Sequence, residues 1–430
     1  MTRKFFGTDG VRGLVGSDPM SADFALRLAS AAAQVLVPSG GTVLIGKDTR
    51  LSGYMFESAL EAGFVAAGAD VLLLGPLPTP GIAHLTQEFN ANLGVVISAS
   101  HNAYHDNGIK FFDGKGSKLS DDVELAIERH LGQPAITVES HKLGRAKRVD
   151  TARDRYQQFC ASTFPDDIDL DGVKIVFDGA NGAGYKVGPR TYGDLGANVI
   201  PIGCSPNGKN INDSCGSTYP GLLQKTVPAV QADVGIALDG DGDRVVMVDE
   251  NGVLLDGDQL LYIIAKARKQ DGSLRGPVVG TVMSNLGLEH ALRRENIEFL
   301  RASVGDRYVL ETLREKGGVI GGETSGHMIC LDKTTTGDGL ISSLQVLAIM
   351  KRSGRSLSDL ASGMPKYPQL MLNVRTDKRM DPAESPKICQ AVSAAEGELA
   401  SAGRVVLRAS GTEPVIRVMV EGEDASQVQS

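Results

Sequence analysis

The stretch Asn92-Leu-Gly-Val-Val-Ile-Ser-Ala-Ser-His-Asn-Ala-Tyr-His-Asp-Asn-Gly-Ile-Lys-Phe-Phe112 changes abruptly from apolar to small and polar residues. Its apolar part, Leu93 to Ile97, is short and rich in β-branched residues, which is typical of a buried strand in a parallel sheet. The residues that follow favour a loop, and ligands of open α/β sheets bind beyond the carboxyl ends of the strands. We therefore expect a loop that presents Ser100 as a nucleophile, although a polar turn with an unreactive serine would fit this motif alone.

A zinc site is a second interpretation of the same stretch. His101 and His105 have the i, i+4 spacing at which two histidines bind zinc from one face of a helix. The residues between and after them form helices poorly, so the pair is not expected to share a face. The serine nucleophile is therefore the favoured interpretation.

The composition argues against several classes of protein. A chain of 430 residues is too long for one hydrophobic core, and 42% hydrophobic with 22% charged residues is ordinary for a globular protein. The net charge of -8 argues against a nucleic-acid partner, and no apolar run reaches the roughly 18 residues of a membrane span. The first residues contain no secretory signal, and the five dispersed cysteines never form a C-x-x-C pair. We expect reduced thiols and a cytoplasmic location.

Strand-like and helix-like segments alternate along most of the chain, which predicts an α/β fold. A basic segment at 141–148 and a proline-containing segment at 363–368 suit domain boundaries. We expect three similar α/β domains at 1–150, 151–248 and 249–364 and a smaller α+β domain at 365–430. The clearest expected strands are 42–45, 71–74, 93–97, 173–177, 234–238, 245–248, 277–281, 370–374, 403–408 and 415–421, and the clearest helices are 54–67, 286–295 and 340–351.

The sequence Leu238-Asp-Gly-Asp-Gly-Asp-Arg244 carries three carboxylates at alternate positions. Oxygens that converge from one tight loop suit a hard divalent cation such as Mg²⁺, and the glycines let the backbone wrap around it. We predict that Asp239, Asp241 and Asp243 bind this cation. An EF-hand does not fit, because Arg244 stands where its loop needs glycine and both flanks resemble strands. A structural acidic turn remains open, although adjacent carboxylates would repel one another.

Three further loops carry more polar groups than a fold requires. Gly321-Gly-Glu-Thr-Ser-Gly-His327 suits a diol and the handling of protons, and Arg408-Ala-Ser-Gly-Thr-Glu-Pro-Val-Ile-Arg417 suits a phosphate. Phe6-Gly-Thr-Asp-Gly-Val-Arg-Gly13 places Arg12 on a glycine-bracketed loop. The plain alternatives are a polar loop with a solvated histidine, a Ser/Thr turn with surface arginines, and a common glycine-rich turn.

Taken together, these motifs closely resemble those of the α-D-phosphohexomutase superfamily. They are Gly7-Thr-Asp-Gly-Val-Arg-Gly13, Ser98-Ala-Ser-His-Asn102 with Asp106-Asn-Gly-Ile-Lys110, Asp239-Gly-Asp-Gly-Asp-Arg244, Gly322-Glu-Thr-Ser-Gly-His327 and Arg408-Ala-Ser-Gly-Thr-Glu-Pro414. The motifs follow the order of the family and span nearly the whole chain. Within the family, the chain is most similar to the bacterial enzymes that act on amino sugars.

The resemblance implies an enzyme of four domains, three of them with mixed sheets, around a central cleft that takes one loop from each domain. It implies that Ser100 is phosphorylated and that Asp239, Asp241 and Asp243 hold Mg²⁺ together with the phosphoserine oxygen. The residues expected to bind sugar hydroxyls are Glu323 and Ser325, and those expected to bind the phosphate that does not react are Arg408, Ser410, Gly411, Thr412 and Arg417.

The implied activity is the interconversion of glucosamine 6-phosphate and glucosamine 1-phosphate through a sugar 1,6-bisphosphate, which feeds UDP-N-acetylglucosamine and cell-wall synthesis. The implied partner is the sugar phosphate, with neither nucleic acid nor membrane, and a homodimer is compatible with the family. The same machinery would suit a phosphoglucomutase or phosphomannomutase. A non-catalytic sugar-phosphate sensor is a third alternative, but the chain retains the serine, the three aspartates and Lys110.

Phosphoryl transfer depends on charge neutralisation and positioning, which suggests roles for the remaining residues. Arg12 and Arg244 would offset charge in the transition state. Lys110 and His327 are the candidates for accepting the proton of the sugar hydroxyl, and Lys110 is preferred because nearby arginines could lower its pKa. His101 is expected to orient the phosphoserine.

Two departures from the family pattern stand out. Position 103 is Ala where the family usually has Pro, which leaves the serine loop less restrained. The chain ends at Ser430, whereas the family usually adds a final helix, so the last domain is expected to be shortened at its C-terminus.

Overall fold

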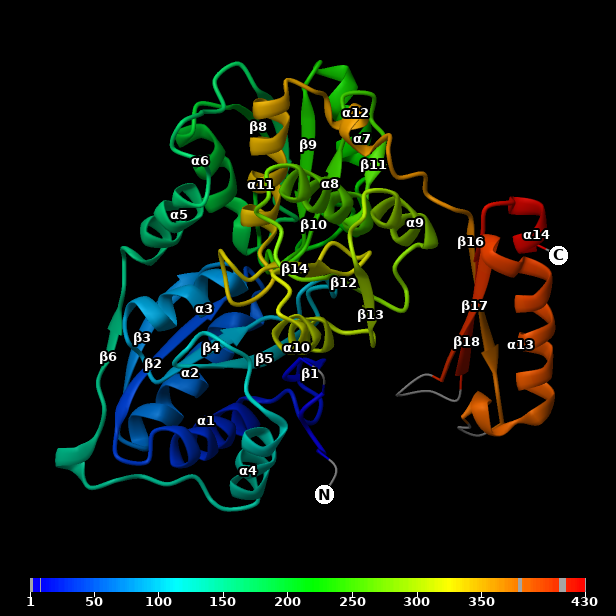
Figure 1. Cartoon of the computed structure of the whole chain (residues 1–430). Coiled ribbons are helices and arrows are strands. Elements are labelled where there is room, and N and C mark those ends of the chain that lie inside the picture. The colour runs from blue at the N-terminus through cyan, green and yellow to red at the C-terminus, as the bar shows by residue number, and fades with distance from the viewer. Residues whose placement is uncertain (1–2, 8, 378–380, 410–414, 430) are drawn as a thin grey trace. The chain divides into compact units, whose positions relative to one another are not determined.

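The computed structural model describes residues 3–7, 9–377, 381–409 and 415–429, except for the side chain of residue 401. The chain divides into two compact units, Met1–Leu260 with Ser325–Leu360 and Leu261–Thr324 with Ala361–Ser430. Helices alternate with strands along most of the chain (Figure 1), which confirms the predicted α/β organisation. The boundaries of the four predicted domains stay a prediction.

The first unit contains a mixed sheet with the strand order β1-β5-β4-β2-β3-β6. Strands β4, β2, β3 and β6 run parallel to one another. Strand β5 is antiparallel to both of its neighbours, β4 and β1. The strands are β1 (Val11–Leu14), β2 (Gly41–Lys47), β3 (Ala69–Pro76), β4 (Leu93–Ile97), β5 (Asp106–Asp113) and β6 (Ala146–Arg148). The helices that accompany them are α1 (Ala22–Leu36), α2 (Ser52–Ala66), α3 (Thr79–Glu88) and α4 (Asp121–Leu131).

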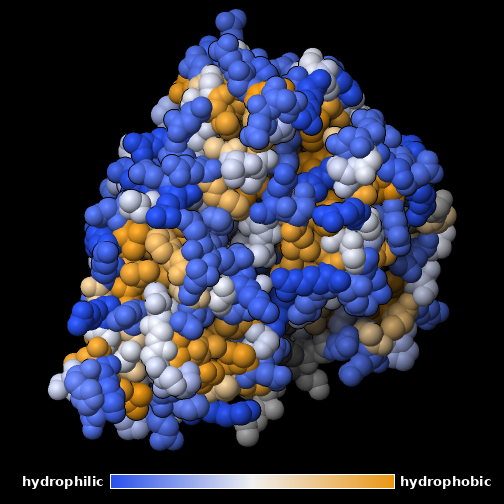
Figure 2. Space-filling view, turned by 60° about the vertical axis from the view of Figure 1, so that its left-hand side comes forward, coloured by the Kyte–Doolittle hydropathy of each residue, from blue (hydrophilic) through white to orange (hydrophobic). Residues whose placement is uncertain are grey.

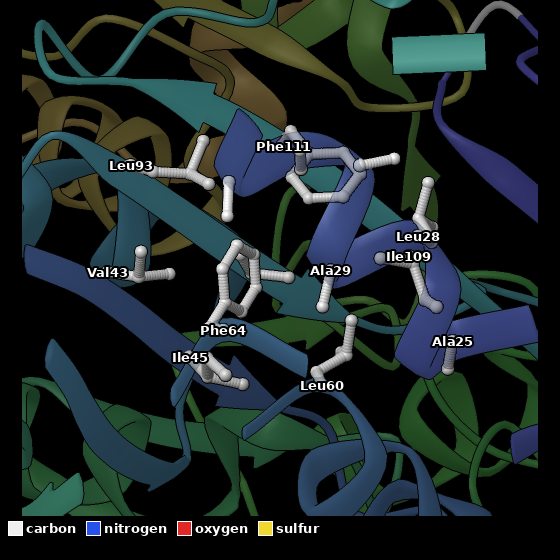
Figure 3. Close-up of a cluster of buried hydrophobic side chains, with 14 of the residues drawn as sticks. Ala25, Leu28, Ala29, Val43, Ile45, Leu60, Phe64, Leu93, Ile109 and Phe111 are labelled. Atoms are coloured by element: carbon white, nitrogen blue, oxygen red, sulfur yellow. The ribbon is translucent and has the colours of Figure 1, made fainter. Parts of the chain in front are cut away.

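The core of this sheet explains why its central strands are so apolar. Every residue of β4 is buried, as a strand covered on both faces requires. Gly94 in β4 allows α3 to approach closely, because a Cβ at this position would lie 2.3 Å from Oγ1 of Thr86. Figure 3 shows side chains from α1, α2, β2, β4 and β5 meeting in one cluster. Each large apolar side chain buried there contributes about 1.5–3 kcal/mol to stability.

A second mixed sheet of the first unit has the strand order β11-β10-β9-β7-β8. Strand β7 is parallel to β8 and β9, and β10 is antiparallel to β9 and β11. The strands are β7 (Lys174–Asp178), β8 (Asn198–Ile202), β9 (Val234–Leu238), β10 (Val245–Val248) and β11 (Leu254–Leu255). The unit also contains α5 (Ala152–Ser162), α6 (Val187–Asp194), α7 (Gly221–Ala229), β15 (Met328–Cys330) and α11 (Gly339–Ser353).

The second unit combines parallel strands with a small antiparallel sheet. Strand β12 is parallel to β13 and to β14. The antiparallel sheet has the order β16-β18-β17, and Figure 1 shows α13 running alongside it. The elements are β12 (Val278–Thr281), α9 (Leu286–Arg294), β13 (Phe299–Ala302), α10 (Asp306–Lys316), β14 (Ile320–Gly322), β16 (Gln369–Arg375), α13 (Pro386–Leu399), β17 (Gly403–Ala409), β18 (Val415–Gly422) and α14 (Ala425–Gln429). Helices α8 (Gly257–Gln270) and α12 (Leu357–Ala361) contain residues of both units.

The sequence prediction failed at the first strand and at the strand that follows the serine loop. Arg12 was expected on a loop but lies in β1. The serine loop spans residues 98–105, between the end of β4 and Asp106, where β5 begins. Glycine, asparagine and charged residues are poor strand formers, yet these segments pair with each other, with Arg12 opposite Gly108. Pairing with a neighbouring strand therefore overrides local propensity here.

On the face shown in Figure 2, hydrophilic residues lie over much of the area with hydrophobic residues between them. None of the helices in the described part of the chain combines the length and apolar character needed to cross a membrane. The five cysteines all lie within the described residues, and they form no disulfide with one another.

Candidate active site

Ser100 lies at the carboxyl end of β4, as the sequence predicted, but its environment differs from the expected one. Its φ is 51°, in the left-handed region that residues other than glycine rarely adopt, and such strain is concentrated at functional sites. The side chain is not presented to solvent, because Ser100 is only 1% exposed. Its hydroxyl donates a hydrogen bond of 2.5 Å to Oδ2 of Asp239. The loop therefore aims the serine at the carboxylates that follow β9.

The three carboxylates after β9 form one compact group. One oxygen from each of Asp239, Asp241 and Asp243 lies within 4.8 Å of the others, and all three residues are buried. Burial together with the neighbouring Asp243 and Asp241 raises the pKa of Asp239 well above its ordinary value. No described residue donates a hydrogen bond to Oδ1 of Asp241 or to Oδ1 of Asp243. A divalent cation would satisfy these oxygens and offset the repulsion, so the residues fit the predicted metal site.

The zinc interpretation finds no support in the structure. Within the ranges that the structure describes, the three aspartates are the only group of at least three His, Cys, Asp or Glu side chains arranged to hold a metal ion. His101 and His105 lie in the connection between β4 and β5 rather than on a helix. A shared helical face, which such a zinc pair needs, is absent from this described segment.

The loop that carries the three aspartates, Asp239 to Asp243, is named the metal loop, and it is also held by hydrogen bonds from α3. The backbone N–H of Thr79 donates to the carbonyl oxygen of Asp241 at 2.9 Å, and the Thr79 hydroxyl donates to Oδ2 of the same residue at 2.7 Å. Hydrogen bonds of this kind fix the orientation of a carboxylate that binds a metal. Thr79 therefore holds Asp241 at both its backbone and its side chain.

Lys110 on β5 lies among carboxylates, contrary to the expectation that arginines would dominate its surroundings. Its Nζ is 2.9 Å from Oδ2 of Asp241 and 2.9 Å from Oδ2 of Asp9. Burial lowers the pKa of Lys110, but Asp241 and Asp9 outweigh burial and raise this pKa above its ordinary value. The expected lowered pKa is therefore wrong. The reason for preferring Lys110 to His327 as proton acceptor is lost, and both remain candidates.

His327 and the arginines are brought to the same group of carboxylates. Nδ1 of the buried His327 is 3.6 Å from Oδ2 of Asp243, and the backbones of His327 and Arg244 pair in an antiparallel bridge. The backbone N–H of Arg244 donates to Oδ1 of Asp239 at 3.2 Å. Asp9 forms an ion pair with Arg12. Burial lowers the pKa of Arg12, but the negative charges of Asp9, Asp241 and Asp243 outweigh burial and raise this pKa above its ordinary value.

His101 has the surroundings of a neutral imidazole. Its Nδ1 lies 3.4 Å from the Ser100 hydroxyl oxygen. Burial, followed by the nearby positive charges of Arg244 and Arg12, lowers the pKa of His101 to about 4. A neutral ring can hold the serine side chain in place without changing its charge near neutral pH. The orienting role of His101 stays a prediction.

The two residues expected to bind sugar hydroxyls fall in different units. Glu323 belongs to the second unit, where Oε1 accepts a hydrogen bond of 3.0 Å from the backbone N–H of Gly305. Ser325 is the first residue of the returning segment of the first unit, and it is exposed. Their contacts with a sugar stay a prediction.

Arg408 and Arg417 form a pair of cations in the antiparallel sheet of the second unit. They are direct partners across β17 and β18. They line a cavity of about 150 Å³ together with Met283, Val304, Met371, Val406 and Met419. Two neighbouring guanidinium groups suit an anion such as phosphate. Ser410, Gly411 and Thr412, which were expected to share this role, lie outside the described residues.

Sequence reasoning missed several residues that support the site. Asp48 and Arg50 contact the serine loop, Asn212 contacts the same loop, and Asp9 contacts Lys110. A signal was present for the first two, because Lys47-Asp-Thr-Arg50 places charges directly after a buried strand. Asp9 belongs to the same glycine-bracketed motif as Arg12. Asn212 lies in a polar loop with no distinguishing pattern.

Comparisons with known proteins point to one family. Family models described as phosphoglucomutase/phosphomannomutase match the chain in four consecutive parts: alpha/beta/alpha domain I at residues 3–135, domain II at 154–252, domain III at 256–367 and the C-terminal domain at 371–430. The chain is 57% identical over 427 residues to a protein from Pseudoalteromonas translucida named phosphoglucosamine mutase, and the match covers 99% of this chain and 95% of that protein.

Solved structures show the same fold. A phosphoglucomutase/phosphomannomutase family protein from Burkholderia thailandensis matches with a TM-score of 0.82 at 23% identity, over 100% of this chain and 95% of that chain. An N-acetylphosphoglucosamine mutase from Aspergillus fumigatus, solved in complex with GlcNAc-6P and magnesium, matches with a TM-score of 0.69 at 17% identity, over 100% of this chain and 94% of that chain.

Proposed function

The chain belongs to the phosphoglucomutase/phosphomannomutase family, and from this premise we propose that it interconverts glucosamine 6-phosphate and glucosamine 1-phosphate, the phosphoglucosamine mutase reaction. The observation that carries the proposal is the Ser100 hydroxyl, which lies 2.5 Å from Asp239 within a buried group of three carboxylates. A strained, buried serine beside a cation site suits phosphoryl transfer. The name of the relative at 57% identity supports the choice of an amino sugar.

The proposed cofactor is Mg²⁺, held by Asp239, Asp241 and Asp243 together with an oxygen of phosphorylated Ser100. Carboxylate oxygens are the ligands that this hard cation prefers, and the unsatisfied Oδ1 atoms of Asp241 and Asp243 fit such a role. Bound Mg²⁺ supplies neutralisation of the charge that develops on a transferring phosphoryl group.

In the proposed cycle, phosphorylated Ser100 donates its phosphoryl group to the free end of the sugar phosphate. The bond from phosphorus to the Ser100 oxygen breaks as a bond to the sugar oxygen forms, and the sugar hydroxyl loses its proton to Lys110 or His327. Arg12 and Arg244 offset the negative charge of the transition state. The product of this step is a sugar 1,6-bisphosphate.

The second half of the cycle returns a phosphoryl group to Ser100. The bisphosphate turns end for end, and the phosphoryl group at its other end is transferred to the serine oxygen as its bond to the sugar oxygen breaks. That sugar oxygen takes back the proton from Lys110 or His327, and the isomeric monophosphate is released. Arg408 and Arg417 bind the phosphate that is not reacting, and their adjacent positions on β17 and β18 support this assignment. Glu323 and Ser325 bind the sugar hydroxyls, and Ser410, Gly411 and Thr412 share the phosphate contacts in this proposal.

The remaining expectations also stay predictions. They are a homodimer, a cytoplasmic location, and a place in the supply of precursors for the cell wall. The five cysteines, all of them described, form no disulfide with one another, which is consistent with the proposed reducing compartment.

The first test replaces the proposed nucleophile. Ser100→Ala removes the atom that carries the phosphoryl group, so turnover of glucosamine 6-phosphate with Mg²⁺ should fall to background while binding of the sugar phosphate stays near normal. Ser162→Ala, an exposed serine on α5, is the control and should leave turnover unchanged. Phosphopeptide mass spectrometry of the native protein should place phosphate on Ser100. Retained turnover in Ser100→Ala would exclude the serine mechanism.

The choice of sugar needs a separate measurement. Initial rates with glucosamine, glucose and mannose phosphates compare kcat/KM under one set of conditions. The proposal expects the amino sugar to give the highest value. A clear preference for mannose or glucose phosphate would leave the serine mechanism in place and refute the assigned substrate.

A further inference from the structure

The side chains of Arg50 and Asn212 bind backbone carbonyl oxygens of the serine loop rather than the Ser100 hydroxyl. We propose that Arg50 and Asn212 are positioning residues for Ser100, an inference that rests on the proposed function. They clamp the backbone of the serine loop against the metal loop and so hold the Ser100 oxygen at the Asp239 carboxylate.

The first half of the clamp is the guanidinium group of Arg50, which is fully buried directly after β2. Its Nη2 donates to the carbonyl oxygens of Ser100 and Asn102, each at 2.9 Å. Its Nη1 donates to the carbonyl oxygens of Ala103 and, at 3.2 Å, Asp106. All four terminal N–H groups of the side chain therefore bind one stretch of backbone, from the reacting serine to the start of β5.

Asp48 joins this arginine to the other side of Ser100. Nε of Arg50 donates to Oδ2 of Asp48 at 2.7 Å, and the Ser98 hydroxyl donates to the same oxygen at 2.6 Å. The Ser98 oxygen in turn accepts a hydrogen bond of 3.0 Å from the backbone N–H of Ser100. Both the N–H and the carbonyl of Ser100 thus lead to one buried ion pair, which accounts for how its strained φ of 51° is maintained.

The second half of the clamp comes from the loop between β8 and α7. Nδ2 of Asn212 donates to the carbonyl oxygens of Ser100 at 2.9 Å and Asn102 at 3.0 Å, the same two oxygens that Arg50 contacts. The backbone N–H of Asn212 is itself fixed by the carbonyl of Ala180 at 2.9 Å. The clamp therefore joins segments that follow two different sheets of the first unit.

The metal loop packs directly against this clamp. A Cβ at Gly240 would lie 2.6 Å from the carbonyl oxygen of Ser100 and 2.7 Å from Nδ2 of Asn212. Gly240 stands between Asp239 and Asp241, so the close approach of its backbone sets the distance from the serine to the carboxylates. Movement of the serine carbonyl would consequently move the reacting oxygen relative to the cation site.

The clamp predicts a particular kinetic signature. Arg50→Lys keeps a positive charge beside Asp48, but one ammonium group cannot reach the four carbonyl oxygens. A displacement of about 1 Å at a reacting atom costs about 100-fold in rate, so kcat of the Mg²⁺-loaded enzyme should fall by about this factor. KM for glucosamine 6-phosphate should change little, because neither clamp residue contacts substrate in the proposed mechanism. Arg50→Ala should be less active than Arg50→Lys, and Asn212→Ala should give a smaller fall in kcat.

A matched control separates positioning from general stability. Glu57→Gln breaks the buried ion pair between Lys47 of β2 and Glu57 of α2, and Glu57 contacts no carbonyl of the serine loop within the described residues. Melting temperatures of all variants should be measured beside kcat, KM and the amount of phosphate that Ser100 takes up from glucose 1,6-bisphosphate. We expect Glu57→Gln to lose stability and to retain kcat, and the clamp variants to lose kcat and phosphate uptake together.

Two results would overturn the clamp. Arg50→Lys and Asn212→Ala could keep kcat within about two-fold of the unaltered enzyme, or Glu57→Gln could lose kcat as much as a clamp variant of equal melting temperature. If Arg50→Lys does not fold, Asn212→Ala decides alone. Absence of phosphate uptake by Ser100 in the unaltered enzyme would refute the proposed function itself, which distinguishes that failure from a failure of the clamp.

Discussion

The serine and metal loops of the first unit and the arginine pair of the second unit are built in opposite ways. Ser100, Asp239 and Asp241 are each 1% exposed, and the first two are joined by a short hydrogen bond. Arg417 is exposed, and so is every residue of the neighbouring strand β16. One region is held by many buried contacts, whereas the other offers one exposed guanidinium group, that of Arg417, and one half-buried guanidinium group, that of Arg408.

This difference matches two kinds of demand. Atoms that exchange a phosphoryl group must be held within a fraction of an ångström, and buried hydrogen bonds provide that precision. A phosphate that is only bound needs complementary charge, which the exposed Arg417 and the half-buried Arg408 provide at lower precision. Substitutions in the buried region should therefore act on kcat, and substitutions at the arginine pair should act on KM.

The largest effect is expected at the metal loop. Asp239→Asn removes a charge from the cation site and weakens the acceptor of the Ser100 hydroxyl, so kcat should fall by about 10³-fold and Mg²⁺ affinity should fall with it. Activity and Mg²⁺ titration by calorimetry measure the two losses. Asp249→Asn is the control, since this buried carboxylate accepts backbone hydrogen bonds from Asn251 and Val253 in the turn after β10. Equal kcat and Mg²⁺ affinity in Asp239→Asn and the unaltered protein would contradict the metal site.

A smaller effect is expected at the arginine pair. Arg417→Ala removes hydrogen bonds to a charged phosphate, each worth about 1.5–3 kcal/mol, so KM for glucosamine 6-phosphate should rise by about 10- to 100-fold. The melting temperature should barely change, because the side chain is exposed. Arg375→Ala on β16 of the same sheet is the matched control and should leave KM unchanged. A fall in kcat at constant KM would place Arg417 at the reacting centre and erase the contrast between the regions.

The same contrast separates what the sequence could predict from what it could not. Apolar runs such as those of β4 and β9 indicate buried strands, so the fold class and the strands and helices named in the sequence analysis followed from local pattern. The motifs singled out Ser100 and the three aspartates, which the structure brings together, and the catalytic roles of these residues stay a prediction. Proposing a cation site needed only the three aspartates of one loop, which the structure groups together.

Contacts between residues that lie far apart in the sequence could not be predicted from it. Lys110 and Asp241 are 131 positions apart, so nothing local revealed that a carboxylate, rather than an arginine, would determine the pKa of the lysine. The charged segment after β2 was a signal for Arg50, but its complete burial and its hydrogen bond to the carbonyl oxygen of Ser100 depend on the distant serine loop and could not be predicted. β1 and β5 were missed because their pairing is likewise a long-range property.

The smallest effect is expected from the titration of His101, and it tests whether the buried region excludes changes of charge. Burial, then Arg244 and Arg12, lower the pKa of His101 from 6.5 to about 4, so the unfolded chain binds this proton more readily than the folded protein. Stability from this residue is therefore complete above about pH 6.5 and is lost as the pH falls toward 4. Since asparagine cannot take up the proton, the melting temperature of His101→Asn should fall less across this range than that of the unaltered protein.

Between pH 6.5 and 8 the ring stays neutral, so the shape of the kcat profile should be the same in both proteins. A step in the profile that disappears in His101→Asn would show that the imidazole changes charge during turnover, and the buried region would then do more than hold atoms in place.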